Sequence, residues 1–304
     1  MNKTEWTAAL NDLLGEAVQI DVPMQKHTTW RIGGRADYLA CPADEGELSA
    51  LLKLLARENM PWLVIGAGSN ILVGDKGIRG VVIKLGEKFS LTEWREQSVR
   101  AGAGKMLPAL ALEAAERGLS GLEFAGGIPG SLGGAVRMNA GAYGNTVGEF
   151  VSSVEVMDYS GQTRILSAAE ITFAYRISSL FEVDAVVCRV SLALSAGSRE
   201  RGMDEIQRLL QLRSLNQPLE FPSCGSVFRN PANDHAGRLI ELANLRGLQI
   251  GGAAVSKKHG NFIINLGGAR AKDVRELIIE VQQRVYDYSG VHLEPEVRMV
   301  GEFT

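Results

Sequence analysis

The segment from residue 126 to residue 144 constrains this chain most strongly, because seven of its nineteen residues are glycine. Arg137 and Tyr143 are its only ionisable side chains. Glycine tolerates positive φ and has no Cβ to hold a ligand away, so successive amides can converge on an anion such as a pyrophosphate. A series of tight turns between strands is the alternative interpretation. The number of glycines and the scarcity of charge favour a loop that cradles a ligand.

Composition limits the class of protein. A chain of 304 residues can form two domains, and 45% apolar with 22% charged residues is typical of a folded protein. The net charge of −3, without a basic stripe, argues against electrostatic binding to nucleic acid or to an anionic membrane. The polar first residues and the lack of a long apolar stretch predict neither a signal peptide nor a membrane span, which indicates the cytoplasm. The oligomeric state stays open, and a monomer is compatible with the sequence.

The cysteines and histidines predict no metal site. The three cysteines are far apart and odd in number, which indicates reduced and mostly buried thiols. Three of the histidines likewise lack the spacing of metal ligands, so surface or hydrogen-bonded histidines are expected. The residues concerned are Cys41, Cys188, Cys224, His27, His235 and His259.

Hydrophobic periodicity and turn residues predict a chain that mixes helices with strands. The expected helices cover residues 1–18, 44–58, 106–117, 203–213, 234–245 and 271–288. The expected strands cover residues 62–65, 71–73, 81–85, 151–158, 163–166, 184–196, 249–255, 261–266 and 292–299. The polar, glycine-containing segment 195–202 is the best candidate for a linker between domains.

An earlier glycine turn, Gly66-Ala-Gly-Ser-Asn70, follows the expected strand 62–65 and resembles the opening of a dinucleotide-binding fingerprint. That fingerprint requires a third glycine at the sixth position and a helix directly after it, whereas Ile71 stands there and leads into a further strand. A phosphate held here would therefore lie in a strand-turn-strand nest without a helix behind it. Two glycine turns about sixty residues apart suggest one elongated ligand, and a flavin dinucleotide fits better than a mononucleotide.

Three further motifs carry reactive side chains. The first is Ala174-Tyr-Arg-Ile-Ser178, and the second is the proline-flanked loop 222–231 around Ser226, which is alternatively a turn-forming serine. The third, residues 292–299, alternates strictly, with a polar face that is either solvated or borders a cleft. A proline inside it indicates an edge strand, and periodicity cannot choose between its two glutamates. Its apolar face is Leu293, Val297 and Met299, and its polar face is His292, Glu294, Glu296 and Arg298.

Six motifs occur in one order between about Thr28 and Gly301. They are Gly-Ala-Gly-Ser-Asn at 66–70, Gly-Ile-Pro-Gly-Ser-Leu-Gly-Gly-Ala at 127–135, Met-Asn-Ala-Gly-Ala-Tyr-Gly at 138–144, Tyr-Arg at 175–176, Cys-Gly-Ser-Val-Phe at 224–228 and Glu-Pro-Glu-Val-Arg at 294–298. Together they closely resemble the UDP-N-acetylenolpyruvoylglucosamine reductase family. The resemblance implies an α+β fold: a vanillyl-alcohol-oxidase-type FAD-binding fold at 1–198, with subdomains at about 1–86 and 87–198, followed by a smaller α/β substrate-binding domain at 199–304.

The resemblance also implies an activity in peptidoglycan synthesis, the NADPH-dependent reduction of UDP-N-acetylglucosamine enolpyruvate to UDP-N-acetylmuramate. NADPH reduces a non-covalently bound FAD, and the flavin N5 then delivers hydride to C3 of the substrate. The catalytic roles fall on Arg176, which binds the substrate carboxylate, on Ser226, which protonates C2, and on Glu296, which orients or polarises the carboxylate. The implied cofactor contacts are Gly66, Ala67, Gly68, Ser69, Asn70, Ile71, Gly127, Gly130, Ser131, Gly133, Gly134, Asn139 and Gly141.

Some positions depart from the family's pattern. Residues 177–226 contain no tyrosine, so the substrate-covering tyrosine loop of longer members is missing and the chain resembles the short-form subgroup. Asn216 stands where many relatives have a lysine. Nearby Arg213 is expected to replace that lysine as a substrate contact, and the alternative is that Arg213 is a solvated helix end. Arg35 replaces a common proline, which should alter loop stiffness more than chemistry.

Two other interpretations remain open from the residues alone. One is a different FAD-dependent oxidoreductase of the same fold, against which the motifs at 224–228 and 294–298 argue. The other is a non-catalytic nucleotide-binding module, which the presence of Arg176, Ser226 and Glu296 together disfavours.

Overall fold

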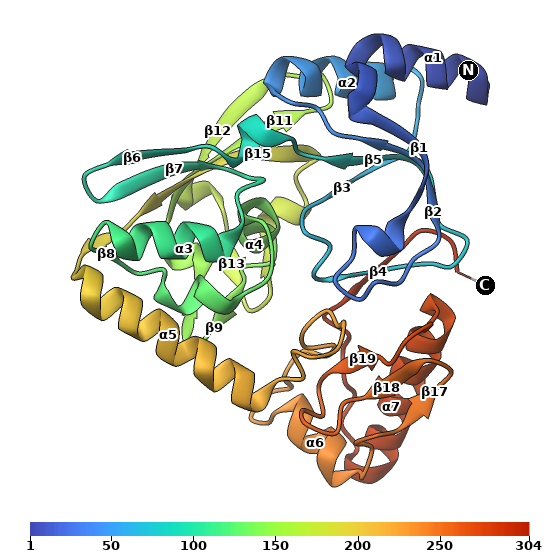
Figure 1. The fold of residues 1–304 in the computed structure, drawn as a ribbon, viewed down its shortest axis with the longest axis vertical. Coiled ribbons are helices and arrows are strands. Elements are labelled where there is room, and N and C mark those ends of the chain that lie inside the picture. The colour runs from blue at the N-terminus through green and yellow to red at the C-terminus, as the bar shows by residue number, and fades with distance from the viewer. Residues whose placement is uncertain (304) are drawn as a thin grey trace. The chain divides into compact units, whose positions relative to one another are not determined.

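The computed structural model describes residues 1–303, which form two compact units. Unit 1 comprises residues 1–20, 38–67 and 80–211, and unit 2 comprises residues 21–37, 68–79 and 212–303. The limits of the units fall after Ala67 and within β1 (Val18–Pro23), β2 (Arg35–Ala40), β5 (Ile78–Lys84) and α5 (Arg199–Asn216), all shown in Figure 1. The domain boundaries predicted at residues 86 and 198 stay predictions.

Unit 1 is built on a five-stranded antiparallel sheet with the order β12-β11-β15-β7-β6. Its strands are β6 (Thr92–Arg95), β7 (Ser98–Gly102), β11 (Val151–Asp158), β12 (Thr163–Ser167) and β15 (Ala185–Ala193). Figure 1 shows α1 (Lys3–Leu14) and α2 (Glu45–Arg57) on one side of this sheet, and α3 (Leu107–Glu116) and α4 (Leu132–Arg137) on the other. Trp6 of α1, Leu51 of α2 and Met157 of β11 meet in the core beneath the first pair of helices.

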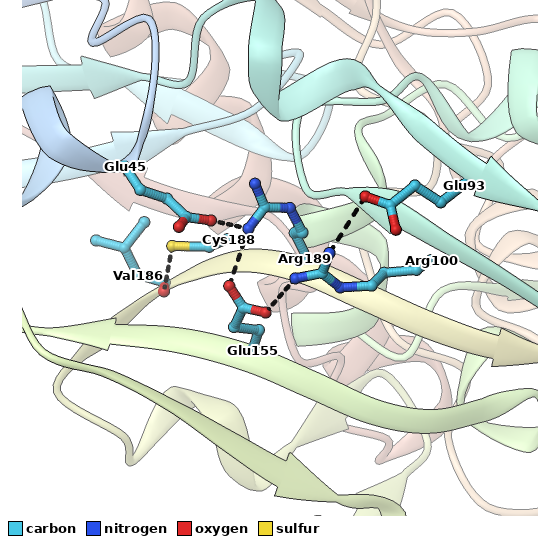
Figure 2. A network of polar contacts seen from close by, with 7 residues as sticks. All are labelled: Glu45, Glu93, Arg100, Glu155, Val186, Cys188 and Arg189. Atoms are coloured by element: carbon cyan, nitrogen blue, oxygen red, sulfur yellow. Dashed lines mark hydrogen bonds and ion pairs between the residues drawn. The ribbon is translucent and has the colours of Figure 1, made fainter.

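A chain of ion pairs crosses one face of this sheet (Figure 2). Glu155 on β11 lies opposite Arg189 on β15, and its two carboxylate oxygens bind the Arg189 guanidinium at 3.0 Å and the Arg100 guanidinium at 2.7 Å. Arg100 also binds Glu93 at 3.3 Å, and Arg189 also pairs with Glu45 at the start of α2. Because the side chain of Glu155 is only 13% exposed, these pairs tie the strands together where water screens them little.

Short elements complete unit 1. In this unit β3 (Trp62–Ile65) pairs in parallel with residues 81–84 of β5. Three two-stranded pairs follow: β8 (Leu119–Ser120) with β16 (Ser195–Ala196), β9 (Gly141–Ala142) with β10 (Asn145–Thr146), and β13 (Phe173–Ala174) with β14 (Ile177–Ser178). Among the described residues of both units, the 3₁₀ helices are η1 (Gly15–Ala17), η2 (Met24–Lys26), η3 (Glu87–Ser90), η4 (Glu123–Gly127), η5 (Val147–Glu149), η6 (Ala168–Glu170) and η7 (Ser179–Phe181).

Unit 2 collects its core from three separate parts of the chain. Its sheet has the order β17 (Gln249–Ile250), β18 (Ala253–Val255) and β19 (Ile263–Asn265), and it carries α6 (Ala236–Leu242) and α7 (Ala271–Ser289). Trp30 from the first part is fully buried among these elements, and its indole Nε1 donates to the carbonyl of Ile263 at 2.7 Å. The last strand, β20 (Arg298–Val300), pairs in parallel with β4 (Ile71–Val73). The pairs of unit 2 therefore bring residues near 70 and residues near 298 together.

Most predicted elements are confirmed, and the differences have local causes. The first helix ends at Leu14 instead of residue 18, because Gly15 turns with a φ of +55° and β1 begins at Val18. The segment 195–202, expected to be a linker, contains β16 and the start of α5. Gly202 is buried there, and a Cβ on it would lie only 3.1 Å from the Cβ of Ala115. This part of α5 therefore packs closely against α3.

The last predicted strand is shorter than expected. Only Arg298–Val300 is a strand, although Leu293 and Val297 are buried as the alternation predicted. Met299 was expected on the same apolar face, and this was wrong, since 38% of it is exposed. The two-stranded sheet of β20 and β4 leaves this residue without the cover that a wider sheet would give. The predicted edge position of the strand agrees with this pairing.

Candidate active site

The turn after β3 has the strand-turn-strand form predicted for it, because β4 follows it directly and no helix does. Gly66, at the unit 1 end of the turn, lies against Ser131: a Cβ on Gly66 would overlap the Ser131 hydroxyl and lie 3.2 Å from the Ser131 Cβ. Only glycine permits this approach without movement. Unit 1 therefore brings the two glycine segments together at one point, as an elongated ligand would require.

Gly68 and Ser69 begin the unit 2 part of the same turn. Gly68 has a φ of +68°, and a Cβ on it would overlap the carbonyl oxygen of His27. Its own carbonyl accepts a 3.1 Å hydrogen bond from the amide of Thr29. Within residues 1–303, the amides of Gly68 and Ser69 donate to no protein acceptor. Two adjacent turn amides that donate to no protein acceptor can bind an anion.

The glycines of the second segment have different tasks. The segment contains the short helix α4, which sequence reasoning did not foresee, and the amides of Leu132 and Gly133 donate to the carbonyls of Lys105 and Ala103, both at 2.8 Å. A Cβ on Gly133 would lie 2.8 Å from that of Ala103, so this glycine permits close packing. Gly134 is exposed, and a Cβ on it would touch only the Ser131 hydroxyl at 3.5 Å. Gly134 therefore presents backbone to solvent or a ligand, while the Gly133 amide is engaged by the protein.

Other predicted cofactor contacts of this segment are buried or engaged. Gly130 is buried, and its carbonyl accepts from the amide of Leu107 at 2.9 Å. Gly127, half-buried, ends η4. Asn139 is 4% exposed, and Gly141 carries the carbonyl that binds Arg176. The cofactor roles assigned to these residues stay predictions.

Arg176 lies at the second position of the two-residue turn between β13 and β14 in unit 1. It has a φ of +59°, a conformation that costs a non-glycine residue about 1–2 kcal/mol. Its guanidinium Nη1 donates to the carbonyl of Gly141 at 2.8 Å and lies beside the ring of Tyr175, at 5.4 Å from the ring centre. The fold therefore holds this cation in one place at the expense of a strained turn.

Ser226 and Glu296 lie on neighbouring segments of unit 2. The amide of Glu296 donates to the carbonyl of Val227 at 2.7 Å, and the amide of Arg229 donates to the carbonyl of Glu294 at 2.9 Å. Ser226 follows Gly225, which turns the chain with a φ of +82°, and its neighbour Val227 is anchored to the carbonyl of Asn261 at 2.9 Å. Both side chains are half-buried. This backbone ladder thus places the segments that carry Ser226 and Glu296 side by side.

Asn70 joins this pair, a connection that sequence reasoning missed. Its side-chain Nδ2 donates to the carbonyl of Glu296 at 3.2 Å, and its own carbonyl accepts from the amide of Arg298 at 3.1 Å. Ile71 continues into β4, opposite Arg298 on β20. The glycine turn predicted for the cofactor and the glutamate predicted for catalysis are therefore contiguous within unit 2. The parallel pairing of two short strands gave no signal in the sequence.

Burial keeps the three cysteine thiols in their neutral forms. Burial, reinforced by the charge of Glu296, raises the pKa of the Cys224 thiol well above its usual value. Burial also raises the pKa of Cys188 to about 12, and it raises that of Cys41.

Among residues 1–303 no group of three His, Cys, Asp or Glu side chains is arranged to hold a metal ion. Nor does any helix in this part of the chain have the length and apolarity to cross a bilayer.

The departures from the family pattern have local explanations. Asn216 is exposed at the end of α5, where its Nδ2 donates to the carbonyl of Leu212 at 2.9 Å. Arg213 is half-buried on the same helix, and its carbonyl accepts from the amide of Gln217. Arg35 forms an exposed ion pair with Asp21 at 2.8 Å. Both side chains of this pair are more than half exposed, so it contributes little to stability.

Comparisons with known proteins agree along nearly the whole chain. Residues 217–300 match the family model of the UDP-N-acetylenolpyruvoylglucosamine reductase C-terminal domain, and residues 36–167 match the model of an FAD binding domain. The UDP-N-acetylenolpyruvoylglucosamine reductase of Heliobacterium modesticaldum is 48% identical over 97% of this chain and 94% of its own length. That of Streptococcus thermophilus is 44% identical over 96% of this chain and 95% of its own length. The crystal structure of the reductase from Thermus caldophilus superposes with a TM-score of 0.82 at 37% identity, covering 93% of this chain and all of that one. The predicted α+β class and FAD-binding fold are confirmed.

Proposed function

Because the chain belongs to the UDP-N-acetylenolpyruvoylglucosamine reductase family, we propose that it reduces UDP-N-acetylglucosamine enolpyruvate to UDP-N-acetylmuramate with NADPH as the electron donor. The observation that carries the proposal is the identity of 48% over 97% of the chain, which spans the FAD binding domain and the C-terminal domain alike. An enzyme of this family is an FAD oxidoreductase.

The residues present fit FAD. In unit 1, the overlap that a Cβ on Gly66 would cause with Ser131 and the exposed backbone of Gly134 support a closely approaching ligand. In unit 2, the unengaged amides of Gly68 and Ser69 support the binding of an anion such as a phosphate. These residues, with Ala67 and Asn70, are the ones we propose to hold the cofactor. FAD, when bound, supplies hydride transfer, which no amino-acid side chain can perform. Its non-covalent attachment is part of the proposal.

Arg176 is proposed to hold the carboxylate of the enolpyruvyl group. When hydride adds to C3, the electron pair of the double bond moves toward C2 and the carboxylate, and an enolate develops. A planar guanidinium can donate two parallel hydrogen bonds to such a group. The bond from Arg176 to the Gly141 carbonyl supports this role, because a donor fixed in advance stabilises charge in the transition state without reorganising.

Ser226 is proposed to complete the reaction by protonating C2. Its O–H bond breaks as the new C–H bond forms, and solvent then restores the proton to the serine oxygen. A serine is a weak acid, but an enolate is a strong base, and the anchored backbone at Val227 supports a fixed approach. Glu296, joined to the same ladder through its amide, is proposed to orient or polarise the carboxylate end of the substrate.

Two measurements test the proposal. The first is NADPH consumption by the FAD-loaded protein, which should accelerate strongly on adding UDP-N-acetylglucosamine enolpyruvate; the same rate with and without it would refute the substrate. The second compares Ser226→Ala with Ser223→Ala, a nearby loop serine to which no role is assigned. Ser226→Ala should keep flavin reduction by NADPH but lose turnover by roughly 100-fold to 10,000-fold, the range of general acid catalysis. Ser223→Ala should keep both, and normal turnover of Ser226→Ala would remove Ser226 from the mechanism.

A further inference from the structure

Two tight hairpins in unit 1 are joined by hydrogen bonds around Arg176. One is the β9–β10 hairpin, with Tyr143 and Gly144 at its tip, and the other is the β13–β14 hairpin, with Tyr175 and Arg176 at its tip. The Arg176 guanidinium reaches from the second hairpin to the carbonyl of Gly141 in the first. In the opposite direction, the side chain of Asn139, which lies two residues before the first hairpin, reaches to the second: its Nδ2 donates to the carbonyl of Ala174 at 2.9 Å.

Asn139 is fixed at both of its polar ends. Its Oδ1 accepts from the amide of Gly148 at 3.0 Å, while its Nδ2 binds Ala174. It is 4% exposed and has a φ of +44°, a conformation that asparagine tolerates better than most residues. Gly148 must be glycine here, because a Cβ on it would lie 2.8 Å from the Asn139 Oδ1 and 2.6 Å from the ring of Phe173. The two hairpins are therefore packed closely around the single amide side chain of Asn139.

The bond from Asn139 fixes the backbone immediately before the strained turn. Ala174 is the last residue of β13, and Arg176 follows two positions later with a φ of +59°. On the far side of the turn, the hydroxyl of Ser178, which is 2% exposed, donates to the carbonyl of Arg137 at 2.8 Å. Both ends of the hairpin are thus tied to the segment 137–141. A turn held at both ends can keep a conformation that it would otherwise relax.

We infer that Asn139 is a positioning residue for Arg176: its amide clasps the carbonyl of Ala174 and so sets where the Arg176 guanidinium meets the substrate carboxylate. This inference rests on the proposed function, because it assigns Asn139 an effect only through the role of Arg176. It differs from the cofactor contact predicted for Asn139 from the sequence. With both polar ends of its side chain bonded to the protein, Asn139 acts on the reaction through the hairpin.

The test uses Asn139→Asp in the FAD-loaded protein. Aspartate keeps the shape, the tolerance for positive φ and the acceptor for the Gly148 amide, but it places an oxygen against the Ala174 carbonyl where a donor was. Rapid-mixing experiments should show an unchanged rate of flavin reduction by NADPH and a rate of flavin reoxidation by UDP-N-acetylglucosamine enolpyruvate that is lower by about 100-fold, as expected for a misplaced catalytic group. The dissociation constant of FAD, measured by flavin fluorescence, should not change. Asn145→Asp is the matched control, because Asn145 is exposed on the same hairpin and forms only a 3.5 Å bond to the Tyr143 carbonyl.

A double-mutant cycle separates positioning from a general loss of structure. If Asn139 acts through Arg176, Asn139→Asp should have no further effect on reoxidation in an Arg176→Ala background. Additive losses, or a raised FAD dissociation constant in Asn139→Asp, would overturn the inference. If Asn139→Asp fails to fold, Ser178→Ala can replace it, because this change loosens the other end of the β13–β14 hairpin and should slow flavin reoxidation selectively. A normal reoxidation rate in Ser178→Ala would count against the positioning role of Asn139. Normal reoxidation by Arg176→Ala alone would instead overturn the proposed role of Arg176, and the inference with it.

Discussion

Gly66→Ala is the substitution for which the structure gives the clearest expected cost. The new methyl group would overlap the Ser131 hydroxyl and lie 3.2 Å from the Ser131 Cβ. Rotation of the Ser131 side chain can remove the first overlap, because the hydroxyl is its free end. The second contact stays, and it is shorter than the roughly 3.5–4.0 Å at which carbon atoms attract each other. Gly66 is not among the glycines with positive φ, so its backbone itself accepts alanine.

These terms give a modest net loss of stability. Overpacking of one methyl group costs about 1–3 kcal/mol, and we expect the lower half of this range because Ser131 can rotate. Replacing glycine also stabilises by about 0.4–1 kcal/mol through the unfolded chain. The net cost is therefore about 1 kcal/mol, which should lower the melting temperature by roughly 2–4 °C. If the methyl group also opposes cofactor binding by about half of that energy, the FAD dissociation constant should rise about twofold.

The assay is a double-mutant cycle with Ser131→Gly, read by thermal unfolding and by the FAD dissociation constant. Ser131→Gly removes both short contacts, which leaves the new Cβ 3.9 Å from the amide nitrogen at position 131. Gly66→Ala should then cost little in that background. Gly102→Ala is the control, because its Cβ would overlap the Phe89 backbone, which Ser131→Gly cannot relieve. An equal cost of Gly66→Ala with and without the Ser131 side chain would refute the reasoning.

Two further predictions concern charge. Glu155→Gln should lower the free energy of unfolding by about 1–3 kcal/mol, because the 13% exposed carboxylate serves two arginines, whereas Glu93→Gln, at 57% exposure, should cost less than about 0.5 kcal/mol. Equal losses in urea unfolding would contradict this difference. Burial and then the charge of Arg246 lower the pKa of His259 from 6.5, so the unfolded chain binds this proton more readily and stability is lost as the pH falls below that value. His259→Gln should therefore reduce the fall in melting temperature between about pH 7.5 and about pH 5.5, and an unchanged fall would assign the effect to other groups.

Helices with one apolar face were predictable because a few residues determine them. The helix expected at 271–288 is α7 (Ala271–Ser289), in which Val274, Leu277 and Val281 are fully buried at helical spacing and Gly290 ends the helix with a φ of +70°. The same holds for α2, where Asp44 caps the helix by accepting from the amide of Glu47 at 3.1 Å. Local spacing and a single cap residue suffice in such cases.

Helix α4 was not predictable for the opposite reason. Its six residues include two adjacent glycines, which oppose helix formation, and six residues are too few to show a period. The helix forms because the amides of Leu132 and Gly133 bond to residues 103 and 105, which are close in space but distant in sequence. The candidate site shares this property. The motifs located Ser226 and Glu296 one by one, but the ladder that joins them depends on pairing across about seventy residues.

The strongest departure from local rules lies around Arg176, and this has a consequence for function. The turn Tyr175-Arg176 contains no glycine, asparagine or proline, so nothing in the sequence predicts a hairpin there. Asn139, Tyr143 and Arg176 all have positive φ, at +44°, +55° and +59°, although glycine would adopt each conformation without strain. Strain of roughly 1–3 kcal/mol per residue persists only where surrounding contacts enforce it, as the bonds to Gly141, Ala174 and Gly148 do for Arg176 and Asn139. A glycine at position 176 would relieve the turn and remove the guanidinium at once. An arginine at this position is therefore not explained by the conformation of the turn, and it agrees with the role proposed for Arg176.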